Sequence, residues 1–166
     1  MTLRVRTAPM SYRGPDRLDV TRKSGGKEGH PFAPSWRTLR AVLDARREAQ
    51  SLRTEAPLKE AETVRARPDL AGVVLENTLE RADAVERFAW AAYVPAYLDE
   101  MEESRARDPK AWARLLARET VTLVCYCADG ERCHRRLLAE LLAACDGAID
   151  DGEVQATSTG ARQMKL

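Results

Sequence analysis

The sequence predicts an α/β fold: one domain with a largely parallel sheet and helices on both faces, in a Rossmann-like layering. The first observation is that residues 121–127 are mostly apolar and β-branched, which is typical of a strand covered on both faces. The second is that helical patterns precede and follow this strand, at residues 109–119 and 132–144, and such alternation favours parallel strands. The length of 166 residues suits a single core. We expect the domain to span residues 1–150, with residues 151–166 as a C-terminal tail or edge segment.

Composition narrows the class of protein. Hydrophobic residues make up 44% and charged residues 32%, as in soluble globular domains. Lys plus Arg (27) nearly equals Asp plus Glu (26), so net charge gives no general attraction to nucleic acid or membrane. No run has the apolar length of a secretion signal or a membrane span. We therefore expect a cytoplasmic protein with no membrane partner and with its four cysteines reduced.

The N-terminal third predicts a strand and then a long loop. Leu3, Val5 and Thr7 alternate with arginines, which is typical of a strand with one wet face, and Pro9 ends it. Residues 10–34 are rich in glycine, proline and charge, and leave room for one short strand at residues 18–21. A loop of this length in a small domain is usually functional or disordered.

The middle of the chain predicts helices with interruptions. Ser35 has the character of an N-cap, because apolar residues follow it at helical spacing. Pro57, Pro68 and Gly72 are expected to break the charged, alanine-rich stretch that follows. Pro95 should kink or split the apolar helix that contains it.

Two helices are better marked, and one segment is ambiguous. Residues 71–82 fit a short strand or a helix equally well. Asp108 followed by Pro109 places a capping carboxylate before a proline at the first helical position. The last helix is predicted from an apolar stripe formed by Leu137, Leu138, Leu141, Leu142 and Cys145.

Three of the four cysteines and one of the two histidines lie within ten residues of each other. Cys125 and Cys127 should face the same side of the strand, at the carboxyl end where parallel sheets bind ligands. Cys133, His134 and Arg135 should open the next helix, after a turn at residues 128–130. Unpaired amides, the helix dipole and nearby cations can lower a thiol pKa or hold an anion there.

Other interpretations of the cysteines compete with a reactive site. Cys145 is expected to pack in the apolar stripe of its helix, and for Cys125 packing and function are evenly balanced. Three cysteines and a histidine also have the composition of a zinc site. Their spacing argues against one, because neighbours such as Cys133 and His134 point about 100° apart on a helix. We therefore predict neither a metal nor another cofactor.

A second candidate segment, TRKSGG, lies in the long N-terminal loop. It has the composition of an anion-binding loop, with hydroxyls, charges and flexible glycines, although a solvated loop fits equally well. Tyr12 and Asp19 are close by in sequence and could supply a stacking face or a base. The residues of this segment that could contact a bound anion are Thr21, Arg22, Lys23 and Ser24.

The cysteine segment resembles the closing motif of the domain-of-unknown-function 488 family. In that motif a strand ends in cysteine, a short acidic turn follows, and Cys-His-Arg opens a helix; here Cys125 stands eight positions before Cys133-His134-Arg135. YRGPDRLDVTRKSG and FAPSW are also similar to the N-terminal part of smaller members. The family commonly has a carboxylate where this chain has Cys127. The resemblance implies an α/β fold and a site at Cys125, Cys133, His134 and Arg135.

These residues lead to one functional hypothesis and one alternative. The hypothesis is an enzyme acting on a phosphate-bearing substrate, a nucleotide or nucleic acid, at catalytic residues Cys125, Cys133 and His134. Cys133 would be the nucleophile or redox thiol and His134 its proton partner, while Arg135 and Arg22 would clamp the anion. The alternative is a non-catalytic module, binding nucleic acid or metal, in which the Cys/His cluster is structural.

Overall fold

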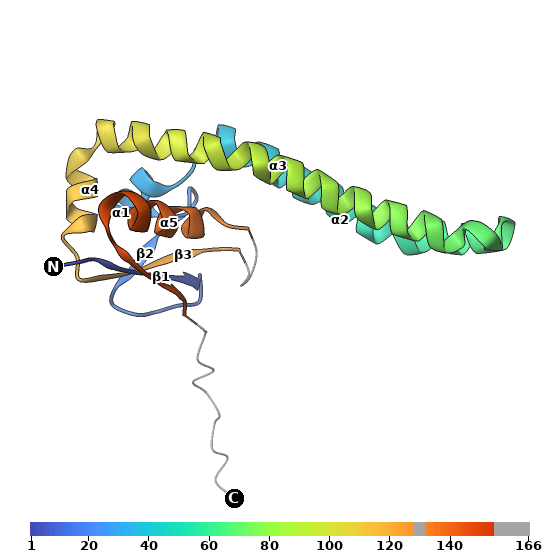
Figure 1. Ribbon diagram of the computed structural model, residues 1–166, viewed down its shortest axis with the longest axis horizontal. Coiled ribbons are helices and arrows are strands. Elements are labelled where there is room, and N and C mark those ends of the chain that lie inside the picture. Colours follow the sequence, from blue (N-terminus) through green and yellow to red (C-terminus); the bar gives the residue numbers. More distant parts are fainter. Residues whose placement is uncertain (128–131, 155–166) are drawn as a thin grey trace, which may run out of the picture. The chain divides into compact units, whose positions relative to one another are not determined.

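A computed structural model describes residues 1–127 and 132–154. Its four strands form one all-parallel sheet in the order β2-β3-β1-β4 (Figure 1). The predicted α/β fold with a parallel sheet is confirmed. The strands are β1 (Arg4–Pro9), β2 (Arg17–Asp19), β3 (Thr120–Cys125) and β4 (Ile149–Glu153).

The interior position of β3 follows from its apolar sequence. Every residue from Val121 to Cys125 is buried, and β3 pairs with β2 on one side and β1 on the other. In β1, Val5 and Thr7 are buried while Arg4 is exposed, in keeping with the predicted alternation, but Ala8 on the opposite face is buried as well. The parallel register places Pro9 opposite Cys125, so both interior strands end at the same edge of the sheet. We call this edge the carboxyl edge.

The helices cover most of the remaining chain. α5 contacts β1, β3 and β4 and lies across one face of the sheet (Figure 1). It ends at Gly147, whose φ of 66° is in the left-handed region that glycine tolerates. The helices are α1 (Gly26–Gly29), α2 (Trp36–Ala66), α3 (Ala71–Arg107), α4 (Pro109–Leu116) and α5 (His134–Asp146), with short 3₁₀ helices at His30–Phe32 and Pro68–Leu70.

The helix breaks predicted at Pro57 and Gly72 are wrong, and of the kink or split predicted at Pro95 the split is wrong. Pro57 lies inside α2, and Gly72 and Pro95 lie inside α3, so neither helix is broken there. A proline removes one hydrogen bond of the helix, which a helix of 31 or 37 residues can lose while its other turns remain bonded. Pro68 does separate the two helices. Residues 71–82, which fitted either a strand or a helix, are helical.

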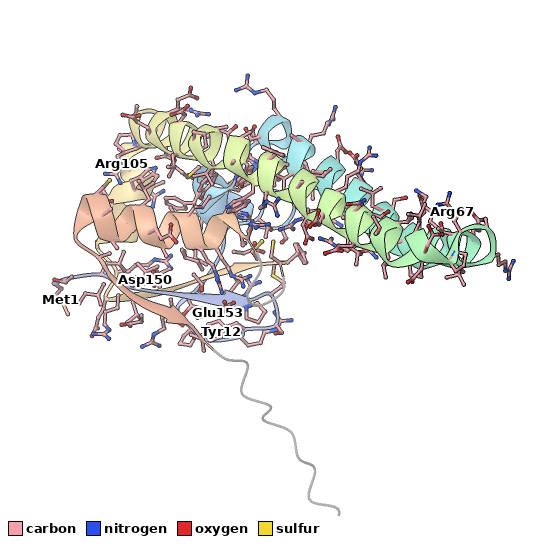
Figure 2. The ribbon with its side chains drawn as sticks, turned by 45° about the vertical axis from the view of Figure 1, so that its right-hand side comes forward. Met1, Tyr12, Arg67, Arg105, Asp150 and Glu153 are labelled. Atoms are coloured by element: carbon pink, nitrogen blue, oxygen red, sulfur yellow. The ribbon has the colours of Figure 1, made fainter. Side chains whose placement is uncertain are left out.

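The chain divides into two compact units. Met1–Pro34 with Glu100–Leu166 contains the sheet, and Ser35–Asp99 contains α2 and most of α3. In the second unit, Arg53 of α2 pairs with Asp83 at 2.7 Å and with Glu86 at 2.9 Å, both on α3, which links the two helices at this point. Arg67 lies where α2 ends and the chain turns towards α3 (Figure 2).

The ends of several elements differ from those predicted. The short strand predicted at residues 18–21 is β2, one residue earlier, and α5 begins two residues later than expected. β4 is an edge strand that pairs with β1, and it includes the first residues of the predicted tail. The predicted turn at 128–130 and residues 155–166 lie outside the described residues. Among the helices described, none has an apolar stretch long enough to cross a bilayer.

Candidate functional site

Three potential ligand atoms converge at the carboxyl edge. The Sγ atoms of Cys125 and Cys133 each lie 4.0 Å from Nδ1 of His134, and the three atoms are all within 4.8 Å of one another. Cys125 ends β3, and His134 is the first residue of α5. Cys133 is the N-cap, with extended backbone angles (φ −147°, ψ 141°). The sequence predicts Cys133 and His134 on successive helical positions. In the structure Cys133 precedes the helix, so both side chains can face Cys125.

The ring of His134 has a defined orientation. Its Nε2 lies 2.8 Å from the backbone carbonyl oxygen of Val20, in the segment that follows β2. A carbonyl oxygen only accepts hydrogen bonds, so Nε2 carries the proton in the neutral ring. Nδ1, on the side of the two thiols, is then the nitrogen with the lone pair. The side chain is buried, so this arrangement is shielded from water.

Thiol reactivity differs from the expectation based on the helix dipole. Hydrogen bonding with Cys127 and burial raise the pKa of Cys125 to about 11. Hydrogen bonds with Cys125 and Cys127, together with burial, raise the pKa of Cys133, so the predicted lowering is wrong. Both thiols are protonated at neutral pH when nothing is bound. Cys145, predicted to pack in the core, is exposed.

Arg135 is a buried structural cation. Its side chain is fully buried; it donates to the carbonyl oxygen of Cys127 at 2.9 Å and forms an ion pair with Glu153 at the end of β4 (Figure 2). Arg136 pairs with the same carboxylate. Glu153 therefore forms ion pairs with two cations in the first turn of α5, where the dipole disfavours positive charge, and offsets one of their two charges. The geometry gives Arg135 the role of holding the chain that follows β3.

Asp19 organises the segment after β2. Its carboxylate accepts hydrogen bonds from the backbone N–H of Thr21 at 3.0 Å, from the Thr21 hydroxyl at 2.7 Å and from the Ser24 hydroxyl at 2.6 Å. A Cβ on Gly29 would lie 1.7 Å from the carbonyl oxygen of Asp19, so glycine is needed for α1 to approach the end of β2. Lys23, between the two hydroxyl residues, is exposed.

Arg22 and Tyr12 bond to parts of the chain away from the thiols. The Arg22 guanidinium donates to the carbonyl oxygens of Pro34 at 2.7 Å and Ala33 at 2.8 Å. The Tyr12 hydroxyl donates to Asp16 at 2.6 Å. Both side chains brace the N-terminal loop, which leaves Lys23 as the more accessible cation of the TRKSGG segment.

Two contacts join the segment after β2 to the cysteine cluster. One is the hydrogen bond between His134 and Val20, and the other runs from the Tyr126 hydroxyl to Oγ of Ser24 at 3.2 Å. The structure thus brings the two candidate segments of the sequence to one edge. The sequence analysis did not single out Tyr126, whose side chain is 61% exposed. The sequence feature that could have identified Tyr126 is its position at the carboxyl end of a predicted strand.

The Asp19 network predicts a specific pH dependence. Burial acts to raise the pKa of the Asp19 carboxyl, but hydrogen bonds from Ser24 and Thr21 outweigh it, so the pKa lies below the ordinary 3.8. The stabilisation is therefore full above that value and is lost as the pH falls through the lower, folded-state pKa. We expect Asp19→Asn to be less stable than the parent at neutral pH, with the difference narrowing on acidification. Urea unfolding across this range measures it; a constant difference would contradict the network, and Asp150→Asn, at an exposed site, is the control.

Comparison with protein families gives a match to part of this chain. The family model DUF488-N3a, described as the active DUF488-N3 subclade, matches residues 74–145. The matched segment runs from α3 into α5, and it includes Cys125, Cys133 and His134. No curated protein and no solved structure matches this chain.

Proposed function

The chain carries a DUF488 family domain, and we propose that this domain is an enzyme acting on a phosphate-bearing substrate, a nucleotide or a nucleic acid. One observation carries the proposal: two thiols and an imidazole meet at the carboxyl edge of a parallel sheet, beside a segment with two hydroxyl side chains. Ligands of open parallel sheets bind at this edge. The description of the matched subclade as active agrees with a catalytic role.

The reactive residues in this proposal are Cys125, Cys133 and His134. As free thiols the cysteines are poor nucleophiles, because their raised pKa values keep them protonated at neutral pH. His134 presents Nδ1 to both sulfurs and can take a proton from either. Arg135 supports the reactive residues through the Cys127 carbonyl and is a positioning residue.

The substrate-binding residues lie on the segment after β2 and on Tyr126. Lys23 offers an exposed cation for a phosphate group, and the Ser24 hydroxyl, which donates to Asp19, fixes the backbone beside it. Asp19 and Thr21 hold this segment in shape through their hydrogen bonds. The exposed ring of Tyr126 provides a stacking surface for a base. Arg22 and Tyr12 shape the loop from behind and are not assigned to the substrate.

The test is a turnover assay with matched cysteine variants. Purified full-length protein is incubated with a panel of nucleoside phosphates and a single-stranded oligonucleotide, and the products are separated by chromatography. Loss of a reactive group typically costs about 10²–10⁴-fold in rate. We expect that loss in Cys133→Ser and an unchanged rate in Cys145→Ser, which makes the same replacement at an exposed position of α5. Equal rates in both variants, or no turnover of any member of the panel, would refute the proposal.

A further inference from the structure

We propose that Cys125, Cys133 and His134 bind one Zn²⁺ ion, through two thiolate sulfurs and the Nδ1 nitrogen. The three atoms lie within 4.8 Å of one another, they come from two different elements, and all three residues are buried. Among the biological divalent ions, zinc is one that prefers thiolate and imidazole ligands. The three-residue set goes beyond the sequence analysis, which predicted no metal.

The interatomic distances agree with a tetrahedral ion. Zn–S bonds of about 2.3 Å and a Zn–N bond of about 2.0–2.1 Å place sulfur and nitrogen roughly 3.6 Å apart. The two distances from sulfur to Nδ1 are both 4.0 Å, so a movement of a few tenths of an ångström brings the side chains to the bonding distance.

The hydrogen bond from His134 to Val20 is a second, independent indication. A histidine that ligates a metal usually donates its other ring N–H to a backbone carbonyl or a carboxylate, which fixes the tautomer and the direction of the ring. Nε2 of His134 lies 2.8 Å from the Val20 carbonyl oxygen, so Nδ1 is the nitrogen that remains for a ligand. This orientation exists before any ion binds.

Charge is balanced at the proposed site. Each of the two thiols loses its proton to solvent on binding, and the two thiolates neutralise the two positive charges of Zn²⁺. The two cations closest along the helix, Arg135 and Arg136, both form ion pairs with Glu153, whose single charge offsets one of theirs. The bound ion therefore adds no net charge to the buried end of α5.

Three protein ligands leave one coordination position open, as in catalytic zinc sites. In the zinc-loaded protein both sulfurs and Nδ1 are ligands, so the roles of nucleophile and proton acceptor given to them above apply to the metal-free protein. Cys127 is the nearest further thiol, with its Sγ 3.7 Å from that of Cys125. Its side chain is only partly buried, and among the described residues it is not in the group of atoms within 4.8 Å of one another. We assign the open position to water or substrate. This assignment alone rests on the proposed function, since metal binding itself needs no substrate.

The test uses Co²⁺ as a spectroscopic substitute for Zn²⁺. Full-length protein is reduced, stripped with a chelator and titrated with Co²⁺, then with Zn²⁺. We expect one equivalent of Co²⁺ to bind with a thiolate-to-cobalt absorption band, and Zn²⁺ to displace it. Cys145→Ser should behave as the parent does. Cys133→Ser should bind more weakly by at least the roughly 10–100-fold that loss of an outer-shell partner causes, because it removes a direct ligand.

The variants separate the possible failures. Cys133→Ser is nearly isosteric, and circular dichroism of the metal-free protein verifies its fold. His134→Ala also removes the hydrogen bond to Val20, so it is a less specific test of metal binding than Cys133→Ser. Absence of the thiolate band in the parent, or equal affinities in Cys133→Ser and Cys145→Ser, would overturn the metal site. Cys127→Ser should retain full affinity, and a loss as large as that of Cys133→Ser would overturn the open position. Intact metal binding without turnover would contradict the proposed enzyme alone.

Discussion

Glu153→Ala is expected to lower the free energy of unfolding by about 3–5 kcal/mol, because it leaves a buried cation without its carboxylate. The Arg135 side chain is fully buried, and Glu153 pairs with it from the end of β4. Desolvation of a guanidinium is costly, and the remaining hydrogen bond to the Cys127 carbonyl offsets only part of that cost. Arg136, which shares the carboxylate, loses this ion pair as well.

Urea denaturation of Glu153→Ala and Asp151→Ala measures this effect on the same strand. Asp151 pairs with Arg4, whose side chain is 48% exposed, so its loss should cost no more than about 1 kcal/mol. Glu153→Ala combined with Arg135→Met should be more stable than Glu153→Ala alone, because no buried charge is left unpaired. A cost for Glu153→Ala no larger than that for Asp151→Ala would show that Arg135 does not depend on this pair.

Trp112→Ala is expected to cost about 3–5 kcal/mol, the range for removal of a large buried aromatic side chain. The Trp112 ring is 2% exposed on α4 and packs edge-on against Phe32, with ring centroids 5.1 Å apart. The Arg105 guanidinium lies 4.3 Å from the centre of the Trp112 ring. The indole N–H also donates to Oγ of Ser104, which in turn donates to the carbonyl of Pro31.

The expected loss therefore includes a cavity, a cation–π contact and a disrupted polar chain. Trp36→Ala is the matched control, because that ring is 54% exposed and its replacement should change stability by less than about 0.5 kcal/mol. Thermal and chemical unfolding of both variants decide the matter. Similar losses in the two would mean that the Trp112 ring does not contribute to the core.

The sheet could be predicted from sequence because its interior strands carry the pattern themselves. The apolar run of β3 indicates a strand buried on both faces, and the alternation in β1 indicates a strand buried on one face. The α4 start was equally local, since Asp108 accepts a hydrogen bond from the Ala111 N–H as an N-cap does. The continuity of α2 and α3 through Pro57 and Pro95 was not predictable, because proline's local preference does not report the many other hydrogen bonds in a long helix.

The candidate site could be predicted in membership more than in chemistry. The convergence of Cys125, Cys133 and His134 followed from a strand end next to a helix start. The backbone of Cys133 did not: an extended N-cap, rather than a helical residue, turns its thiol towards Cys125. The role of Arg135 depended on Glu153, eighteen residues away in a part of the chain expected to be a tail or edge segment. Long-range ion pairs of this kind leave no mark in the local sequence.

That Cys125, Cys133 and His134 form one functional centre is tested most directly by X-ray absorption at the zinc edge of the zinc-loaded, full-length protein. The predicted spectrum has sulfur neighbours at about 2.3 Å together with nitrogen or oxygen neighbours at about 2.0–2.1 Å. The sulfur contribution should be reduced in Cys133→Ser and unchanged in Cys145→Ser. A first shell of only oxygen and nitrogen, the same in the parent and in Cys133→Ser, would contradict it.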